Sequence, residues 1–103
     1  MNIFCVVGQI EELPNVRETP PGDKVGQVVL RVERPFANAQ GQYEYDKVQI
    51  EVWRGLAETI SNVSKVDDFI SVKGRISTRI VEKEGHTYYN YAFVAEKIGF
   101  LHP

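Results

Sequence analysis

The sequence predicts an all-β domain: a barrel of five strands with one helix between the third and fourth strands. Five stretches are rich in Val, Ile, Tyr and Phe and alternate apolar with polar residues, as strands with one buried face do. One segment has helical spacing instead, and turn-forming residues separate the stretches. The predicted strands are residues 2–10, 25–34, 45–53, 69–82 and 87–100.

The first predicted strand contains the apolar run Ile3-Phe4-Cys5-Val6-Val7. Cys5 is the only cysteine, so an internal disulfide is excluded, and this fits a reducing compartment. Because Cys5 lies within an apolar run, we expect a small buried side chain and not a reactive thiol.

The second predicted strand has one apolar and one mostly polar face: Val28, Leu30 and Val32 alternate with Val29, Arg31 and Glu33. Turn-forming residues flank it, at Pro20-Pro21-Gly22-Asp23 and at Asn38-Ala39-Gln40-Gly41-Gln42.

The third predicted strand places a large ring on its polar face. Val48, Ile50 and Val52 form an apolar face, so alternation turns the other set outward: Lys47, Gln49, Glu51 and Trp53. A partly solvated indole is suited to stacking against a flat group. Covering a hairpin or filling a subunit interface is the alternative role for this ring.

The predicted helix covers residues 54–65. Its apolar residues are spaced three or four apart and form one helical face: Leu56, Ala57, Ile60 and Val63.

The fourth predicted strand carries a polar and basic outward set: Ser71, Lys73, Arg75, Ser77 and Arg79. An exposed ring beside a basic ridge is the surface that binds single-stranded nucleic acid. The turn at Glu84-Gly85-His86 leads into the fifth strand, whose Tyr88, Tyr89 and Tyr91 we expect to be mainly structural.

This element order matches an OB-fold, the small Greek-key barrel used for oligonucleotides and oligosaccharides. Other five-stranded barrels, including SH3-like ones, are compatible with the same order. In the OB-fold, residues 37–46 and 81–88 would form hairpin arms beside the binding face.

Length and composition indicate a single domain spanning residues 1–103. Hydrophobic residues make up 43% and charged residues 25%, which is ordinary for a globular protein. No basic leader followed by an apolar segment and no apolar run of membrane-spanning length is present, so we expect a cytoplasmic protein without a membrane partner.

The net charge of −2 is unusual for a protein that binds nucleic acid, because such binding is driven largely by cations that neutralise phosphates. The distribution of charge differs from its total. Acidic residues concentrate at expected turns and strand ends, whereas six cations fall within the strands: Arg31, Arg34, Lys47, Lys73, Arg75 and Arg79.

Several motifs together resemble the bacterial single-stranded DNA-binding protein (SSB) family over essentially the whole chain. In order they are Met1-Asn2 with Val6-Val7-Gly8-Gln9-Ile10, then 16–22, 30–36, 52–58, 74–79 and 94–101. The resemblance implies an OB-fold and sequence-independent binding of single-stranded DNA in replication, recombination or repair.

The resemblance also implies that bases stack on Phe36 and Trp53. Two positions depart from the family pattern, since Lys47 and Val81 stand where many members carry aromatic residues. Losing two stacking rings should weaken binding or shorten the bound site. Tyr89 and its neighbouring tyrosines are candidate replacements.

The chain stops directly after the last predicted strand, without the Gly/Gln/Pro-rich linker and acidic recruiting tip typical of replicative members. It therefore resembles a short tailless member, a phage or mobile-element version, or a trimmed chain. The family implies a homo-oligomer, with a tetramer favoured and a dimer as the alternative.

We therefore expect a non-enzymatic domain without cofactor or metal. Catalytic sets, phosphate-binding glycine loops and grouped metal ligands are not apparent in the sequence. The predicted DNA-binding residues are Phe36, Trp53, Arg31, Arg34, Lys47, Lys73, Arg75, Arg79 and Tyr89. The alternative is a primosomal-type, dimeric interaction subunit that binds DNA weakly.

Overall fold

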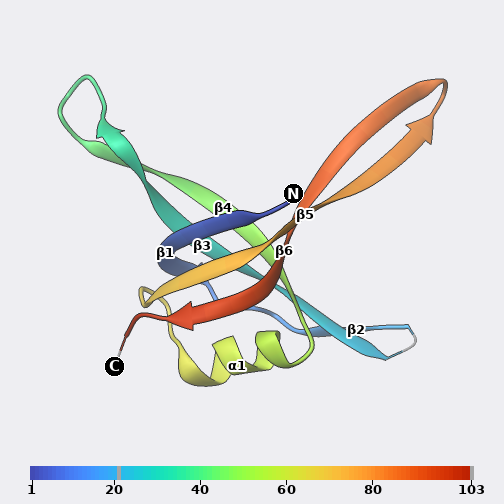
Figure 1. Cartoon of the computed structure of the whole chain (residues 1–103), viewed down its shortest axis with the longest axis horizontal. Helices are drawn as coiled ribbons and strands as arrows, with labels where there is room; N and C mark the ends of the chain where they lie inside the picture. Colours follow the sequence, from blue (N-terminus) through green and yellow to red (C-terminus); the bar gives the residue numbers. More distant parts are fainter. Residues whose placement is uncertain (21, 103) are drawn as a thin grey trace.

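The computed structural model describes residues 1–20 and 22–102. Seven elements follow one another: β1 (Phe4–Glu12), β2 (Arg17–Thr19), β3 (Asp23–Ala37), β4 (Tyr43–Trp53), α1 (Gly55–Val63), β5 (Phe69–Lys83) and β6 (His86–Phe100). The helix lies below the strands in Figure 1 and connects β4 to β5. The helix predicted at 54–65 is therefore confirmed, one residue shorter at its N-terminal end and two residues shorter at its C-terminal end.

Five long strands close into a barrel. The sheet order is β1-β5-β6-β4-β3-β2, and an additional pairing between β1 and β3 completes the ring. All pairings are antiparallel except β4 with β6, which run parallel where Ile50 is paired with Phe93. This closed barrel confirms the predicted fold class, and closure removes the exposed edges that an open sheet would present.

One strand, β2, is absent from the prediction. It has three residues and pairs with the start of β3, Arg17 opposite Val25 and Thr19 opposite Asp23. Three residues are too short to show an alternating pattern, so its existence depends on the partner strand. Pro21 of the turn predicted at 20–23, and Pro103 at the end of the predicted single domain, lie outside the described residues.

The core is built from the inward faces of the long strands and one side of α1. Fully buried aliphatic side chains come from four strands and the helix: Ile10, Leu30, Ile50, Ile60 and Ile70. On α1, Ala57 and Ile60 are buried and Leu56 packs against the core, whereas Val63 is exposed. The predicted apolar face of the helix therefore meets the barrel over three of its four positions.

Cys5 is exposed, so the prediction of a buried side chain is wrong. The run in which it lies is apolar on both faces of β1. Phe4 and Val6 pack against the core, and alternation then turns Cys5 and Val7 outward. An uninterrupted apolar run does not show which of its residues point inward.

At Gly74 two neighbouring strands leave no room for a side chain. A Cβ at this position would lie 1.9 Å from the Val94 carbonyl oxygen and 2.7 Å from the Phe4 ring. The β5–β6 register also shifts between Lys73 and Gly74, so the backbone is already irregular there.

Gly74→Ala should therefore lower the free energy of unfolding by about 1–3 kcal/mol, because the backbone must move to admit the methyl group. Urea denaturation measures this change. Gly55→Ala is the matched control, since a Cβ at Gly55 meets no atom within 4 Å. Equal stability of the two variants would contradict the prediction.

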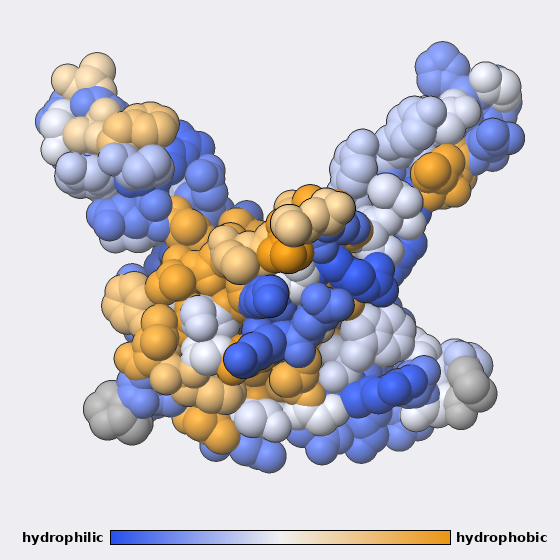
Figure 2. All heavy atoms as spheres, viewed as in Figure 1, coloured by the Kyte–Doolittle hydropathy of each residue, from blue (hydrophilic) through white to orange (hydrophobic). Residues whose placement is uncertain are grey.

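Two hairpins extend beyond the barrel as arms, and Figure 2 shows them standing apart on either side of a broad gap. The β3–β4 arm turns at 38–42, where the Asn38 side-chain oxygen accepts hydrogen bonds from the Gln40 and Gln42 backbone N–H groups, both at 2.9 Å. The β5–β6 arm turns through Glu84 and Gly85, both with positive φ, as a two-residue hairpin turn requires. Both turns occur where the sequence predicts them.

Candidate nucleic-acid interface

Trp53 ends β4 on its outward side, as alternation predicts, and it is half-buried. Antiparallel pairing sets the neighbours of this side from β3: Lys47 lies opposite Arg31, Gln49 opposite Val29, and Glu51 opposite Gln27. We call the outward residues Arg31, Gln27, Lys47, Gln49, Glu51 and Trp53 the β3–β4 face. The indole therefore lies on a mostly polar or charged surface, to which Val25, opposite Trp53, and Val29 add apolar side chains.

The edge of the Trp53 ring is fixed by a carboxylate. Its Nε1–H donates to Glu51 Oε1 at 2.6 Å. Arg79 Nη2 reaches the same oxygen at 3.1 Å and Glu51 Oε2 at 3.4 Å. Since the Glu51 side chain is only 8% exposed, these donors compensate a carboxylate largely removed from water. Residues of β4 and β5 that are distant in sequence thus meet at one point.

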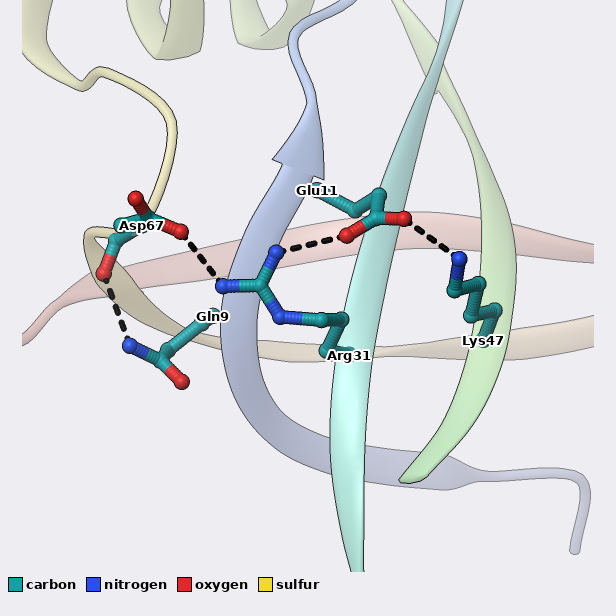
Figure 3. Close-up of polar contacts among 5 residues, drawn as sticks. All are labelled: Gln9, Glu11, Arg31, Lys47 and Asp67. Atoms are coloured by element: carbon teal, nitrogen blue, oxygen red, sulfur yellow. Dashed lines mark hydrogen bonds and ion pairs between the residues drawn. The ribbon is translucent and has the colours of Figure 1, made fainter. Parts of the chain in front are cut away.

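A second cluster of charged side chains surrounds Arg31 and Lys47 of the β3–β4 face (Figure 3). Arg31 donates to Glu11 Oε1 at 2.6 Å and to Asp67 Oδ1 at 2.5 Å. Lys47 Nζ lies 2.6 Å from Glu11 Oε2, and Gln9 donates to the Asp67 backbone oxygen. Both predicted phosphate-binding cations here are therefore already paired with carboxylates.

The pKa values follow this pairing. Hydrogen bonds from Lys47 and Arg31 lower the pKa of Glu11 below its usual value. Hydrogen bonds to Asp67 and Glu11 raise the pKa of Arg31. Glu11 therefore remains ionised, and the cluster remains paired, at neutral pH.

Arg34 forms a third pairing at the base of the β3–β4 arm. Its Nε and Nη2 donate to Asp46 Oδ1 at 3.1 and 2.8 Å, and Glu44 lies 3.6 Å away. This contact lowers the pKa of Asp46 and raises that of Arg34. Like Arg31, Lys47 and Arg79, Arg34 would have to exchange a carboxylate for a phosphate.

Lys73 and Arg75 differ from the other predicted cations. Within residues 1–20 and 22–102 neither has a carboxylate at ion-pair distance. Lys73 lies opposite Cys5 of β1 and Lys97 of β6, and it lines a surface hollow with them. Alternation puts Lys73 and Arg79 on one side of β5, but only Arg79 reaches the group around Trp53.

The two arms carry exposed aromatic rings. Phe36 is 64% exposed on one arm and Tyr89 is 63% exposed on the other. Tyr43 and Tyr45 are also exposed and were not among the predicted site residues. The period of two that singles out Trp53 places both on the same side of β4 as Lys47, so extending it toward the turn would have found them.

The closed barrel, its flanking arms and a face of rings and paired cations define an OB-fold domain. A family profile described as "Single-strand binding protein family" matches residues 1–101. The chain belongs to this family.

Curated relatives have similar sequences. The chain is 40% identical over 102 residues to "Single-stranded DNA-binding protein 3" of Listeria innocua, which covers 98% of this chain and 64% of that protein. It is 38% identical over 104 residues to "Single-stranded DNA-binding protein" of Halalkalibacterium halodurans, covering 100% and 62%. The chain thus spans less than two thirds of the length of these relatives.

Two solved structures have the same fold. One is a deletion mutant of the single-stranded DNA binding protein from Thermus aquaticus, with a TM-score of 0.77 and 24% identity, covering 99% of this chain and 51% of that one. The other is a Plasmodium falciparum SSB complex with ssDNA, with a TM-score of 0.77 and 17% identity, covering 99% and 96%. The names of these relatives do not favour the alternative of a primosomal-type interaction subunit.

Among residues 1–20 and 22–102, no three His, Cys, Asp or Glu side chains gather as metal ligands. In the same part of the chain, the helix lacks the length and apolar character needed to cross a membrane.

Proposed function

We propose that this domain binds single-stranded DNA without sequence specificity and protects it during replication, recombination or repair. The observation that carries the proposal is the β3–β4 face, where a tryptophan and cations share one side of a barrel flanked by two arms with exposed rings. Family membership and the names of the relatives support it. Binding of this kind needs no catalytic group, and the cytoplasm is where we expect it to act.

Bases would stack on Phe36 and Trp53, with Tyr89 as a further ring and Tyr45 on the same side of β4 as Trp53. Stacking on aromatic rings is tolerant of sequence because every base has a flat face. Phosphates would contact the six predicted cations: Arg31, Arg34, Lys47, Lys73, Arg75 and Arg79. Exchange of the solvent-exposed partners Asp46 and Asp67 for a phosphate costs little, since exposed ion pairs are weak. Arg79 would have to leave Glu51, which is largely removed from water.

A homo-oligomer, with a tetramer favoured and a dimer as the alternative, is part of the proposal. The outward side of β1 supports it, because Ile3 and Val7 are half exposed and Cys5 lies between them. Covering an apolar strand face with a second copy removes it from water and so stabilises the pair of copies. Light scattering of the purified chain measures the number of copies.

Titration with oligo-dT tests the DNA-binding proposal. Trp53 is the only tryptophan, so all indole fluorescence comes from it, and a base that stacks on its ring should quench that fluorescence. The association constant should fall as salt rises, because phosphate contacts release counterions. No quenching and no gel shift at low salt would contradict DNA binding by this face.

A further inference from the structure

The β5–β6 arm, which extends beyond the barrel in Figure 1, has two different sides. Residues that pair across an antiparallel ladder point to the same side of it, and the side alternates from one pair to the next. Three pairs form one side, which we call the Tyr88 side: Arg79 with Asn90, Val81 with Tyr88, and Lys83 with His86. The intervening pairs form the Tyr89 side: Thr78 with Tyr91, Ile80 with Tyr89, and Glu82 with Thr87.

The Tyr88 side is continuous with the β3–β4 face. Arg79 belongs to this side and reaches Glu51 at 3.1 Å, the carboxylate to which the Trp53 ring donates. Tyr88 lies opposite Val81, two residues farther along β5 than Arg79, which is a step of about 7 Å. A strand of DNA that leaves Trp53 and passes over Arg79 therefore meets Tyr88 next. Tyr89 lies on the opposite side of the arm.

The two sides of the arm also differ in charge. The Tyr88 side has Arg79 and Lys83 and no carboxylate, whereas the Tyr89 side has Glu82 and no cation. Glu84 belongs to the turn at the tip of the arm. Lys83 is exposed, and within residues 1–20 and 22–102 no carboxylate lies at ion-pair distance from it. Because cations drive the binding of nucleic acid, phosphates are attracted to the Tyr88 side.

The Tyr88 ring is exposed but has neighbours that hold it. It is 51% exposed, and its centroid lies 5.7 Å from that of the His86 ring at an interplanar angle of 48°. Val81 lies directly across on β5, and pairs of an aromatic with a β-branched residue stabilise a sheet. A ring held by such neighbours loses less rotamer freedom when a base stacks on it.

We propose that the Tyr88 side of the β5–β6 arm extends the DNA-binding surface, with one base stacked on Tyr88 and one phosphate in contact with Lys83. This inference rests on the proposed function. It names Tyr88, and not Tyr89, as the main stacking ring of this arm, and it adds Lys83 to the six predicted cations.

The test compares two tyrosines that are neighbours in sequence but lie on opposite sides of the arm. Tyr88→Ala should raise the dissociation constant of a labelled oligo-dT about fivefold or more, the lower end expected for one stacked base. Tyr89→Ala is the matched control, because it removes the same ring from a position that is 63% exposed, and it should have the smaller effect. Tyr88→Phe should bind as the wild type does, since stacking needs the ring and not the hydroxyl group.

Lys83→Gln tests the phosphate contact. It should reduce the slope of log K against log salt by about 0.7, the amount for one phosphate contact on a single strand. Lys65→Gln is its control, because Lys65 is an exposed lysine between α1 and β5, outside both arms, and its replacement makes the same charge change. Thermal denaturation checks that all these variants are folded.

Two results would overturn the inference while DNA binding stands. One is a loss of affinity in Tyr89→Ala that equals or exceeds the loss in folded Tyr88→Ala. The other is an equal salt slope in Lys83→Gln and Lys65→Gln. Failure of the wild-type chain to bind oligo-dT at low salt would overturn the proposed function as well.

Discussion

Trp53→Ala should weaken binding of single-stranded DNA by about 1–3 kcal/mol, which is roughly 5- to 150-fold in the dissociation constant. The loss has two parts. The stacking surface disappears, and Glu51 loses its 2.6 Å hydrogen bond from the indole. The carboxylate is then compensated by Arg79 alone, so its charge acts more strongly on a nearby strand. Anisotropy of a labelled oligo-dT measures the change without using the indole.

Trp53→Phe separates the two parts. Phenylalanine keeps an aromatic face but has no N–H group to donate to Glu51. If stacking dominates, Trp53→Phe should retain most of the affinity, and thermal denaturation should show that both variants are folded. Affinity equal to wild type in the folded Trp53→Ala variant would show that DNA does not use this ring.

The strands and their outward faces could be predicted because alternation is a local property. Val48, Ile50 and Val52 fix the orientation of β4 by themselves, and Trp53 then lies on the opposite side. The same rule fails for Cys5, because its neighbours on both sides are apolar. It cannot find β2, which has three residues and depends on β3 for its hydrogen bonds.

The partners of the cations could not be predicted because they come from distant parts of the chain. Arg31 is separated from Asp67 by 36 positions and Arg79 from Glu51 by 28. A single sequence shows six cations within strands but not the carboxylates that the barrel brings to four of them. The carboxylates that give the chain its net negative charge therefore include the partners of these cations, at the face where phosphates would bind.

This local pairing has a measurable consequence at Glu11, which holds Lys47 and shares Arg31 with Asp67. Glu11→Gln should release Lys47 fully and Arg31 in part, so oligo-dT should bind more tightly at low salt. Each phosphate contact on a single strand adds about 0.7 to the slope of log K against log salt. One to two new contacts should steepen that slope by about 0.7 to 1.4.

Lowering the pH tests these ion pairs less cleanly than Glu11→Gln does. Lys47 and Arg31 lower the pKa of Glu11, so the ion pairs are present above its ordinary value and are lost only as the pH falls through the depressed one. A fall in pH also acts on the whole chain and not on Glu11 alone. A substitution at Glu11 isolates the effect at the pH where the protein would work.

Glu12→Gln is the control that decides the interpretation. Glu12 is the next residue of β1, is exposed, and has no cation at ion-pair distance among the described residues. Both substitutions remove one negative charge, so weaker general repulsion of DNA should affect them equally. A steeper salt slope in Glu11→Gln alone would show that Glu11 competes with phosphate for Lys47 and Arg31. Equal slopes in the two variants would show that these cations do not contact the strand.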